Sequence, residues 1–144
     1  MPFETYATLL NLKIVIPSSK SNYVAIEKSY WIALFFPNIA QIDLDQDWYL
    51  KRYPDVAAAV GSDVVADAQQ HYCEAGYFEH RIPYQIDVDE GWYVAQYADV
   101  QAAVANLVFN SAQEHFEKTG YREGRYPYAG FALRKRDDKP SAKR

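Results

Sequence analysis

Two histidines at equivalent positions are the side chains best suited to chemistry. His71 is followed by Tyr72 and His115 by Phe116, each within a stretch that we expect to be helical. Two such histidines can bind a metal ion or transfer protons near neutral pH. Neither has the cysteine and histidine partners of a metal site at ligand spacing. We therefore predict packed histidines that bond to the returning loop, with no metal and no cofactor.

Three alternating acids begin like a calcium-binding loop. They are Asp43, Asp45 and Asp47. An EF-hand loop also requires glycine at its sixth position and glutamate at its twelfth. Here those positions hold Trp48 and Pro54. We predict instead that Asp45 caps a helix, because its carboxylate can accept from free backbone N–H groups. The other acids are expected in a solvated turn.

A glutamate and an arginine lie two residues apart in each of two loops. The pairs are Glu79 with Arg81 and Glu123 with Arg125. Such a loop can bind an anion or sugar hydroxyl groups. Alternatively, the side chains pair with an aspartate of the same repeat, Asp55 or Asp99, and fix the loop to a helix junction. We favour this second interpretation because so aromatic a loop needs fixed polar partners.

These residues belong to an internal repeat of 44 residues. Residues 42–84 align with residues 86–128 without a gap, and 21 of the 43 positions are identical. A match of this density indicates tandem duplication. It divides the chain into an N-terminal capping and interaction segment (1–41), helical repeats (42–85 and 86–129) and a basic flexible tail (130–144).

Each repeat has the signals of short helices. Asp45 precedes the first helix, and the alanine-rich residues 56–60 form the second. A third helix is expected over 68–75 and again over 112–119. Its N-cap is Asp67 in one repeat and Ser111 in the other. Gly76 and Gly120 stand where a glycine ends a helix.

The N-terminal segment follows a different pattern. Residues 12–17 have the composition of a short strand, and residues 18–22 that of a turn. Residues 23–36 fit either a strand or a helix, so a β-hairpin is one alternative. We expect a mainly α protein: a tandem pair of short-helix repeats with this segment as a cap.

The repeat resembles a tandem repeat of bacterial proteins. The first copy carries Tyr-Pro-Asp-Val at 53–56 and His-Tyr at 71–72, and the second carries Glu-Gly-Arg at 123–125. The copies depart from that pattern at His80, where glycine is usual, and at Ala98, where proline is usual. Such repeats often accompany glycosyltransferases and other proteins of surface-polysaccharide production. The resemblance therefore implies an accessory setting and carries over no catalytic residue.

Composition and charge restrict the partners and the location. The net charge is −4, which argues against nucleic-acid binding over the whole surface. The longest apolar run, residues 30–36, is far shorter than a membrane span. Without a signal sequence, the chain is expected to be cytoplasmic, and a single cysteine fits a reducing compartment.

The 23 aromatic residues suggest where a partner binds. Those repeated in both copies are expected in the core. The candidate contact surface consists of apolar residues that are not repeated: Trp31, Leu34, Phe35, Phe36, Phe78, Phe109 and Tyr126. The basic tail, with Arg134, Lys135 and Arg136, is expected to add electrostatic steering.

The sequence thus predicts a non-catalytic module that binds a protein partner or assembles with itself. The resemblance places it beside the machinery of bacterial polysaccharide synthesis or export. The alternative is a carbohydrate-binding protein that stacks sugars on exposed aromatic rings. An enzyme is a weaker alternative, because no catalytic motif has a recognised spacing.

Overall fold

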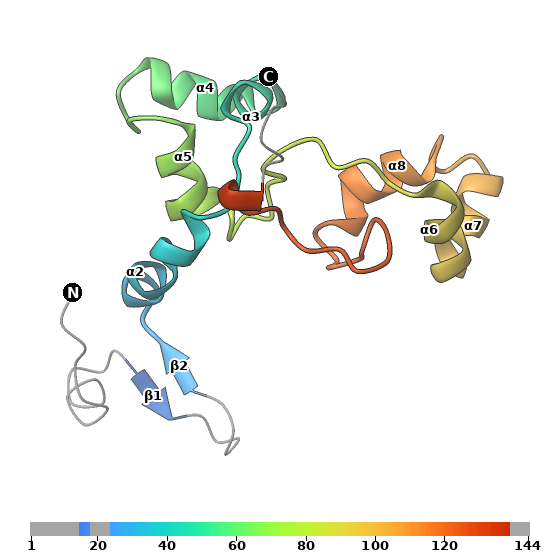
Figure 1. The fold of residues 1–144 in the computed structure, drawn as a ribbon, viewed down its shortest axis with the longest axis horizontal. Helices are drawn as coiled ribbons and strands as arrows, with labels where there is room; N and C mark the ends of the chain where they lie inside the picture. Colours follow the sequence, from blue (N-terminus) through green and yellow to red (C-terminus); the bar gives the residue numbers. More distant parts are fainter. Residues whose placement is uncertain (1–14, 18–23, 139–144) are drawn as a thin grey trace. The chain divides into compact units, whose positions relative to one another are not determined.

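The computed structural model describes residues 15–17 and 24–138, which are mainly helical, as predicted (Figure 1). The chain forms two compact units, Met1–Ile39 and Ala40–Arg144. Among the described residues, no helix is both long enough and apolar enough to cross a bilayer. The predicted turn at 18–22 and the last six residues of the predicted tail lie outside the described residues.

The first unit combines a small hairpin with one helix. Strands β1 (Val15–Pro17) and β2 (Val24–Ile26) pair antiparallel, with Val15 opposite Ile26. Helix α2 (Lys28–Ile39) follows, and the Glu27 carboxylate accepts from the backbone N–H groups of Ser29 and Tyr30 at its start. Both alternatives for residues 23–36 are therefore present, because this stretch holds one strand and most of one helix.

Each repeat in the second unit has the same order of elements. Repeat one contains α3 (Gln46–Arg52), α4 (Pro54–Gly61) and α5 (Ala68–His71), which continues into the π-helical turn η1 (Tyr72–Gly76). Repeat two contains α6 (Glu90–Gln96), α7 (Ala98–Ala105), α8 (Ala112–His115) and the π-helical turn η2 (Phe116–Gly120). In Figure 1, α3–α5 form one group and α6–α8 another.

The predicted N-caps begin the helices as expected. The carboxylates of Asp45 and Asp89 each accept a 3.0 Å hydrogen bond from the backbone N–H three residues later. Asp67 and Ser111 cap the third helix in the same way, at 2.8 and 3.0 Å. Pro54 begins α4, where its missing N–H needs no partner.

The repeated glycines have a different role from the one predicted. Gly76 and Gly120 are the buried last residues of the π-helical turns, not C′ residues. A Cβ at either position would lie 2.2 Å from the hydroxyl oxygen of Tyr49 or Tyr93. Glycine is therefore required by a close approach between helices. The left-handed residue lies four positions later, at His80 (φ 60°) and Gly124 (φ 73°).

A shared core joins the repeats. Tyr93, Val100 and Phe116 of repeat two are buried together with Ile82 and Tyr84 from the end of repeat one. The linker between the repeats thus contributes side chains to the core of the second. This arrangement explains why many repeated aromatic residues lie inside the protein.

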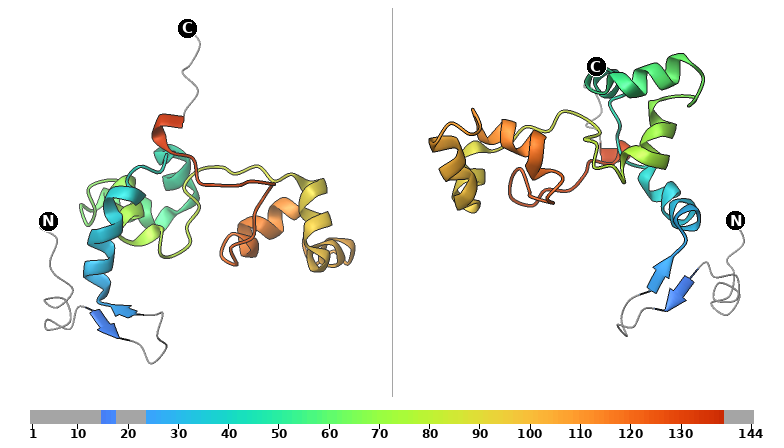
Figure 2. Two further views of the ribbon diagram at one scale, coloured as in Figure 1. Left: turned by 60° about the horizontal axis from the view of Figure 1, so that its bottom comes forward. Right: turned by 180° about the vertical axis from the view of Figure 1, so that it is seen from behind.

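The C-terminal segment differs from the flexible tail that its composition predicted. After repeat two the chain runs back to repeat one, and its last described residues form a short 3₁₀ turn, η3 (Arg136–Asp138) (Figure 2). The backbone N–H of Asp43 donates to the carbonyl of Arg134 at 2.8 Å, and the N–H of Arg136 donates to the carbonyl of Gln41 at 2.9 Å. Backbone pairing, which charge composition does not reveal, holds this part of the predicted tail.

Two glycines allow the free-energy cost of a side chain in the left-handed conformation to be measured without steric clashes. A Cβ at Gly124 or Gly61 would meet nothing within 4 Å, but only Gly124 has a positive φ. We expect Gly124→Ala to lower the free energy of unfolding by about 1 kcal/mol. Gly61→Ala, at the end of α4, should raise it by about 0.5 kcal/mol. Urea unfolding of both variants checks this, and equal effects would contradict it.

Candidate functional site

The loop after each third helix is fixed by an arginine. Arg81 donates from both terminal nitrogens to the Asp55 carboxylate, at 3.0 and 2.7 Å, and from Nε to Glu79 at 2.8 Å. Its guanidinium also lies 4.8 Å from the centre of the Tyr53 ring. The Tyr53 hydroxyl accepts the backbone N–H of Ile82 at 2.8 Å. One arginine and one tyrosine thus join the loop to the α3–α4 junction.

Repeat two has the same arrangement. Arg125 donates to Asp99 at 2.8 and 2.6 Å and to Glu123 at 2.6 Å, and its guanidinium lies 4.9 Å from the Tyr97 ring centre. The hydrogen bonds from Arg125 lower the pKa of Asp99 from 3.8 to about 2. The predicted pairing of the loop with the aspartates is confirmed for the two arginines, and each glutamate pairs with its own arginine. These carboxylates and guanidiniums are therefore engaged within the scaffold.

The two histidines are packed, as predicted, but their partner differs. Nδ1 of His71 lies 3.1 Å from the hydroxyl of Tyr49, and Nδ1 of His115 lies 3.1 Å from that of Tyr93. Burial lowers the pKa of both histidines and raises that of Tyr93 to about 12. The partner is a helix tyrosine and not the returning loop, which is held by Arg81 or Arg125 instead.

The three alternating acids have separate roles. Asp45 caps α3, and the buried Asp43 accepts a 2.7 Å hydrogen bond from Nε of Arg134. Asp47 is exposed at the start of the same helix. Over the part of the chain that the structure describes, no group of three or more His, Cys, Asp or Glu side chains is placed to hold a metal ion.

A groove brings together two of the predicted contact residues. Phe78 from repeat one and Tyr126 from repeat two line the same groove of about 360 Å³. Most of its lining is aromatic or apolar: Tyr77, Phe78, Tyr121, Tyr126, Phe131 and Leu133. Tyr77 and Tyr126 are exposed, and Phe78 is half-buried. We call these six residues the aromatic groove.

A more polar groove of about 740 Å³ adjoins the aromatic groove and shares His80 and Tyr121 with it. Arg52 and Glu117 form a 3.1 Å ion pair among its lining residues. Lys118 pairs with Glu114. Arg122 makes no ion pair within the described residues. A ligand in the aromatic groove would therefore have charged side chains next to it.

The remaining predicted contact residues lie elsewhere. Phe109 packs edge-on against the His115 ring, with 4.8 Å between centroids, so it supports that histidine and is only half-exposed. Trp31 and Phe35 lie one turn apart on α2, with centroids 4.1 Å apart, and each remains more than a third exposed. Leu34 and Phe36 on the same helix are half-buried.

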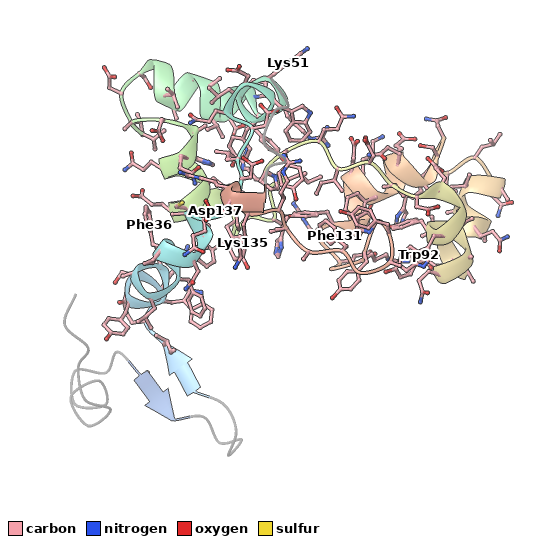
Figure 3. All side chains as sticks on the ribbon, viewed as in Figure 1. Phe36, Lys51, Trp92, Phe131, Lys135 and Asp137 are labelled. Atoms are coloured by element: carbon pink, nitrogen blue, oxygen red, sulfur yellow. The ribbon has the colours of Figure 1, made fainter. Side chains whose placement is uncertain are left out.

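The C-terminal segment contributes residues that sequence reasoning missed. Phe131, which is labelled in Figure 3, lies against Tyr126 and Tyr128, with centroids 6.1 and 5.5 Å apart. Arg134, predicted to steer partners from a flexible tail, is paired with Asp43. Repetition predicts a core position for both Tyr77 and Tyr121. Tyr77 is instead exposed and Tyr121 half-buried, and both line the aromatic groove.

Comparisons with protein-family models, with curated proteins and with solved structures find no match for this chain.

The arginine contacts predict a loss of stability on truncation. We expect Arg125→Ala to lower the free energy of unfolding by about 1–2 kcal/mol, because a forked ion pair and a stacked guanidinium are lost at a half-exposed site. Arg125→Lys should lose part of this free energy, because lysine cannot donate two parallel hydrogen bonds to the carboxylate. Arg122→Ala is the matched control in the same loop and should change little. Unchanged thermal stability of Arg125→Ala would contradict the scaffold role.

The same contact predicts an acid dependence. The pKa of Asp99 is lower in the folded state than its ordinary value, so its contribution to stability is present above about pH 4 and is lost as the pH falls towards 2. The stability difference between the wild type and Arg125→Ala should therefore shrink over this range. Denaturant titrations at pH 6 and at pH 2.5 measure it.

Proposed function

We propose that this protein is a non-catalytic interaction module whose aromatic groove binds a partner protein. The single observation that carries this proposal is that Phe78 and Tyr126 line one groove, although they occupy non-equivalent positions in the two repeats. Duplication alone does not explain aromatic residues at these positions. Large aromatic side chains with little conformational entropy are typical anchors of protein interfaces.

The engagement of the polar residues supports the same proposal. The histidines, loop glutamates, loop arginines and paired aspartates all have partners inside their own repeat. A catalytic group must reach a substrate, and these groups are used to hold the fold. A binding role accounts for the exposed aromatic side chains of the groove, which have no such structural role.

The setting of this interaction comes from the resemblance alone. Similar repeats accompany bacterial surface-polysaccharide production, so we propose an accessory role beside that machinery in the cytoplasm. The close, tilted ring pair of Trp31 and Phe35 on α2 is a second contact surface in the other unit. It fits the same kind of partner, because an exposed tryptophan–phenylalanine pair is a typical interface feature.

Carbohydrate binding is the second candidate. It is favoured by the charged side chains beside the aromatic groove, since sugars are bound by stacking on rings and by hydrogen bonds from neighbouring polar groups. Arg122 has no ion-pair partner among the described residues and lines the adjoining groove next to Tyr121. An acidic sugar would stack on the aromatic rings and pair with Arg122.

Removing aromatic side chains of the groove should weaken partner binding without lowering the stability of the fold. We expect the double variant Phe78→Ser, Tyr126→Ser to lose at least about tenfold in capture of the native partner, while its thermal unfolding stays close to that of the wild type. The measurement is affinity capture from the native cell with the tagged full chain, quantified by mass spectrometry. Val64→Ser, which removes an exposed apolar side chain outside the groove, is the matched control.

Two outcomes decide between the candidates. Partner capture that is identical for the wild type and the double variant would contradict a role for the groove. Binding on a glycan array that Tyr126→Ser abolishes, without a captured protein, would favour the carbohydrate function instead.

A further inference from the structure

The C-terminal segment binds repeat one at a defined surface. The Arg134 backbone N–H donates to the hydroxyl of Tyr84 at 2.8 Å, and its guanidinium carbon lies 4.3 Å from the centre of that ring. Nε of Arg134 donates to Asp43 at 2.7 Å. Backbone bonds to Gln41 and Asp43 flank these contacts, with Ile42 opposite Lys135 in an antiparallel bridge. Asp43, Tyr84 and the backbone at 41–43 therefore form a receptor for an extended, arginine-bearing segment.

Repeat two contains the same receptor residues. Asp87 and Tyr128 occupy the positions equivalent to Asp43 and Tyr84, and Ile86 the position equivalent to Ile42. The two parts of the receptor are joined alike in both repeats. The Asp45 N–H donates to the Pro83 carbonyl at 3.1 Å, and the Asp89 N–H donates to the Pro127 carbonyl at 3.0 Å. The duplication has thus preserved both the residues and the backbone connection between them.

No segment of the described chain pairs with the receptor in repeat two, where Phe131 alone lies edge-on against Tyr128. Tyr84 is 7% exposed and Asp43 3% exposed beneath the C-terminal segment. In repeat two, Tyr128 is 40% exposed and Asp87 is also exposed. The Asp87 carboxylate accepts a 3.1 Å hydrogen bond from Gln85 Nε2, a surface contact that an arginine can replace. Ile86 beneath them is buried, which holds this stretch of backbone in place.

The backbone of repeat two also has free groups at the equivalent positions. Gln113 accepts from the Val88 N–H and donates to the Ile86 carbonyl, both at 2.8 Å. The Asp87 N–H and the Gln85 carbonyl are equivalent to the groups that bind the segment in repeat one. Neither has a hydrogen-bond partner among the described residues.

We infer that repeat two carries a second, open receptor, formed by Asp87, Tyr128 and the backbone at 85–87, for an extended segment of a partner protein that contains an arginine. The arginine would pair with Asp87 and stack on Tyr128, and the segment's backbone would bond to residues 85–87, as in β-strand addition. This inference rests on the proposed interaction function and names a partner class for a surface that adjoins the aromatic groove at Phe131 but contains none of its six residues.

A second copy of this chain is a poorer occupant. The described chain contains one such segment, and its own repeat one already binds it. If one copy placed its C-terminal segment on repeat two of a neighbour, its own repeat one would lose that segment. The total number of docked segments would therefore stay the same. Segments docked within one chain also have a high effective concentration, which favours the internal site.

The probe for the test is a capped synthetic peptide with the sequence of residues 130–137, titrated into the full chain by calorimetry. We expect one peptide to bind per chain. Asp87→Asn should weaken binding by about tenfold or more, because a charged hydrogen-bond partner is lost. A peptide with alanine at the position of Arg134 should show the same loss. Asp47→Asn removes an exposed acid from repeat one and is the matched control.

The outcomes separate this inference from the proposed function. No binding at millimolar peptide, or binding that Asp87→Asn leaves unchanged, would overturn the open receptor. Concentration-dependent dimers that Asp87→Asn abolishes would overturn the assignment of the occupant to a different protein. None of these results depends on Phe78 or Tyr126, so the role of the aromatic groove is decided by its own variants.

Discussion

Each repeat depends on the contact between a buried tyrosine and a glycine. The hydroxyl oxygens of Tyr49 and Tyr93 lie only 2.2 Å from where a Cβ on Gly76 or Gly120 would be, and each hydroxyl also bonds a histidine of the third helix. This contact brings the first helix against the π-helical turn with no room for a side chain. Such close packing makes the position intolerant of added volume.

The other features of each repeat follow from this contact. Once the π-helical turn is in place, the loop can return to the junction of the first two helices, where an arginine and a tyrosine hydroxyl hold it. The polar groups that most resemble catalytic residues are engaged in this scaffold. Two copies of one scaffold then differ at their surfaces, because each faces different neighbours. Phe78 and Tyr126 meet in a groove, and the C-terminal segment covers only one of two equivalent receptors.

The sequence predicted the parts of the fold that depend on local residue spacing or on the duplication. The N-caps lie immediately before their helices, and the Arg125–Asp99 pair is supported by its second copy in Arg81 and Asp55. The π-helical turns and the tyrosine–glycine approach require three-dimensional packing that periodicity does not contain. Arg134 was misassigned because its partners, Asp43 and Tyr84, lie 91 and 50 positions away. Basic composition is the same whether such a segment is free or docked.

The most direct test of the central contact is a double-mutant cycle on the free energy of unfolding. In the wild type, Gly120→Ala should cost roughly 2–4 kcal/mol, because its Cβ overlaps the Tyr93 hydroxyl. With Tyr93→Phe that oxygen is gone, and the next atoms lie 3.4 and 3.5 Å from the Cβ. The cost of Gly120→Ala should then fall by at least about 1 kcal/mol. Strictly additive costs would contradict the account.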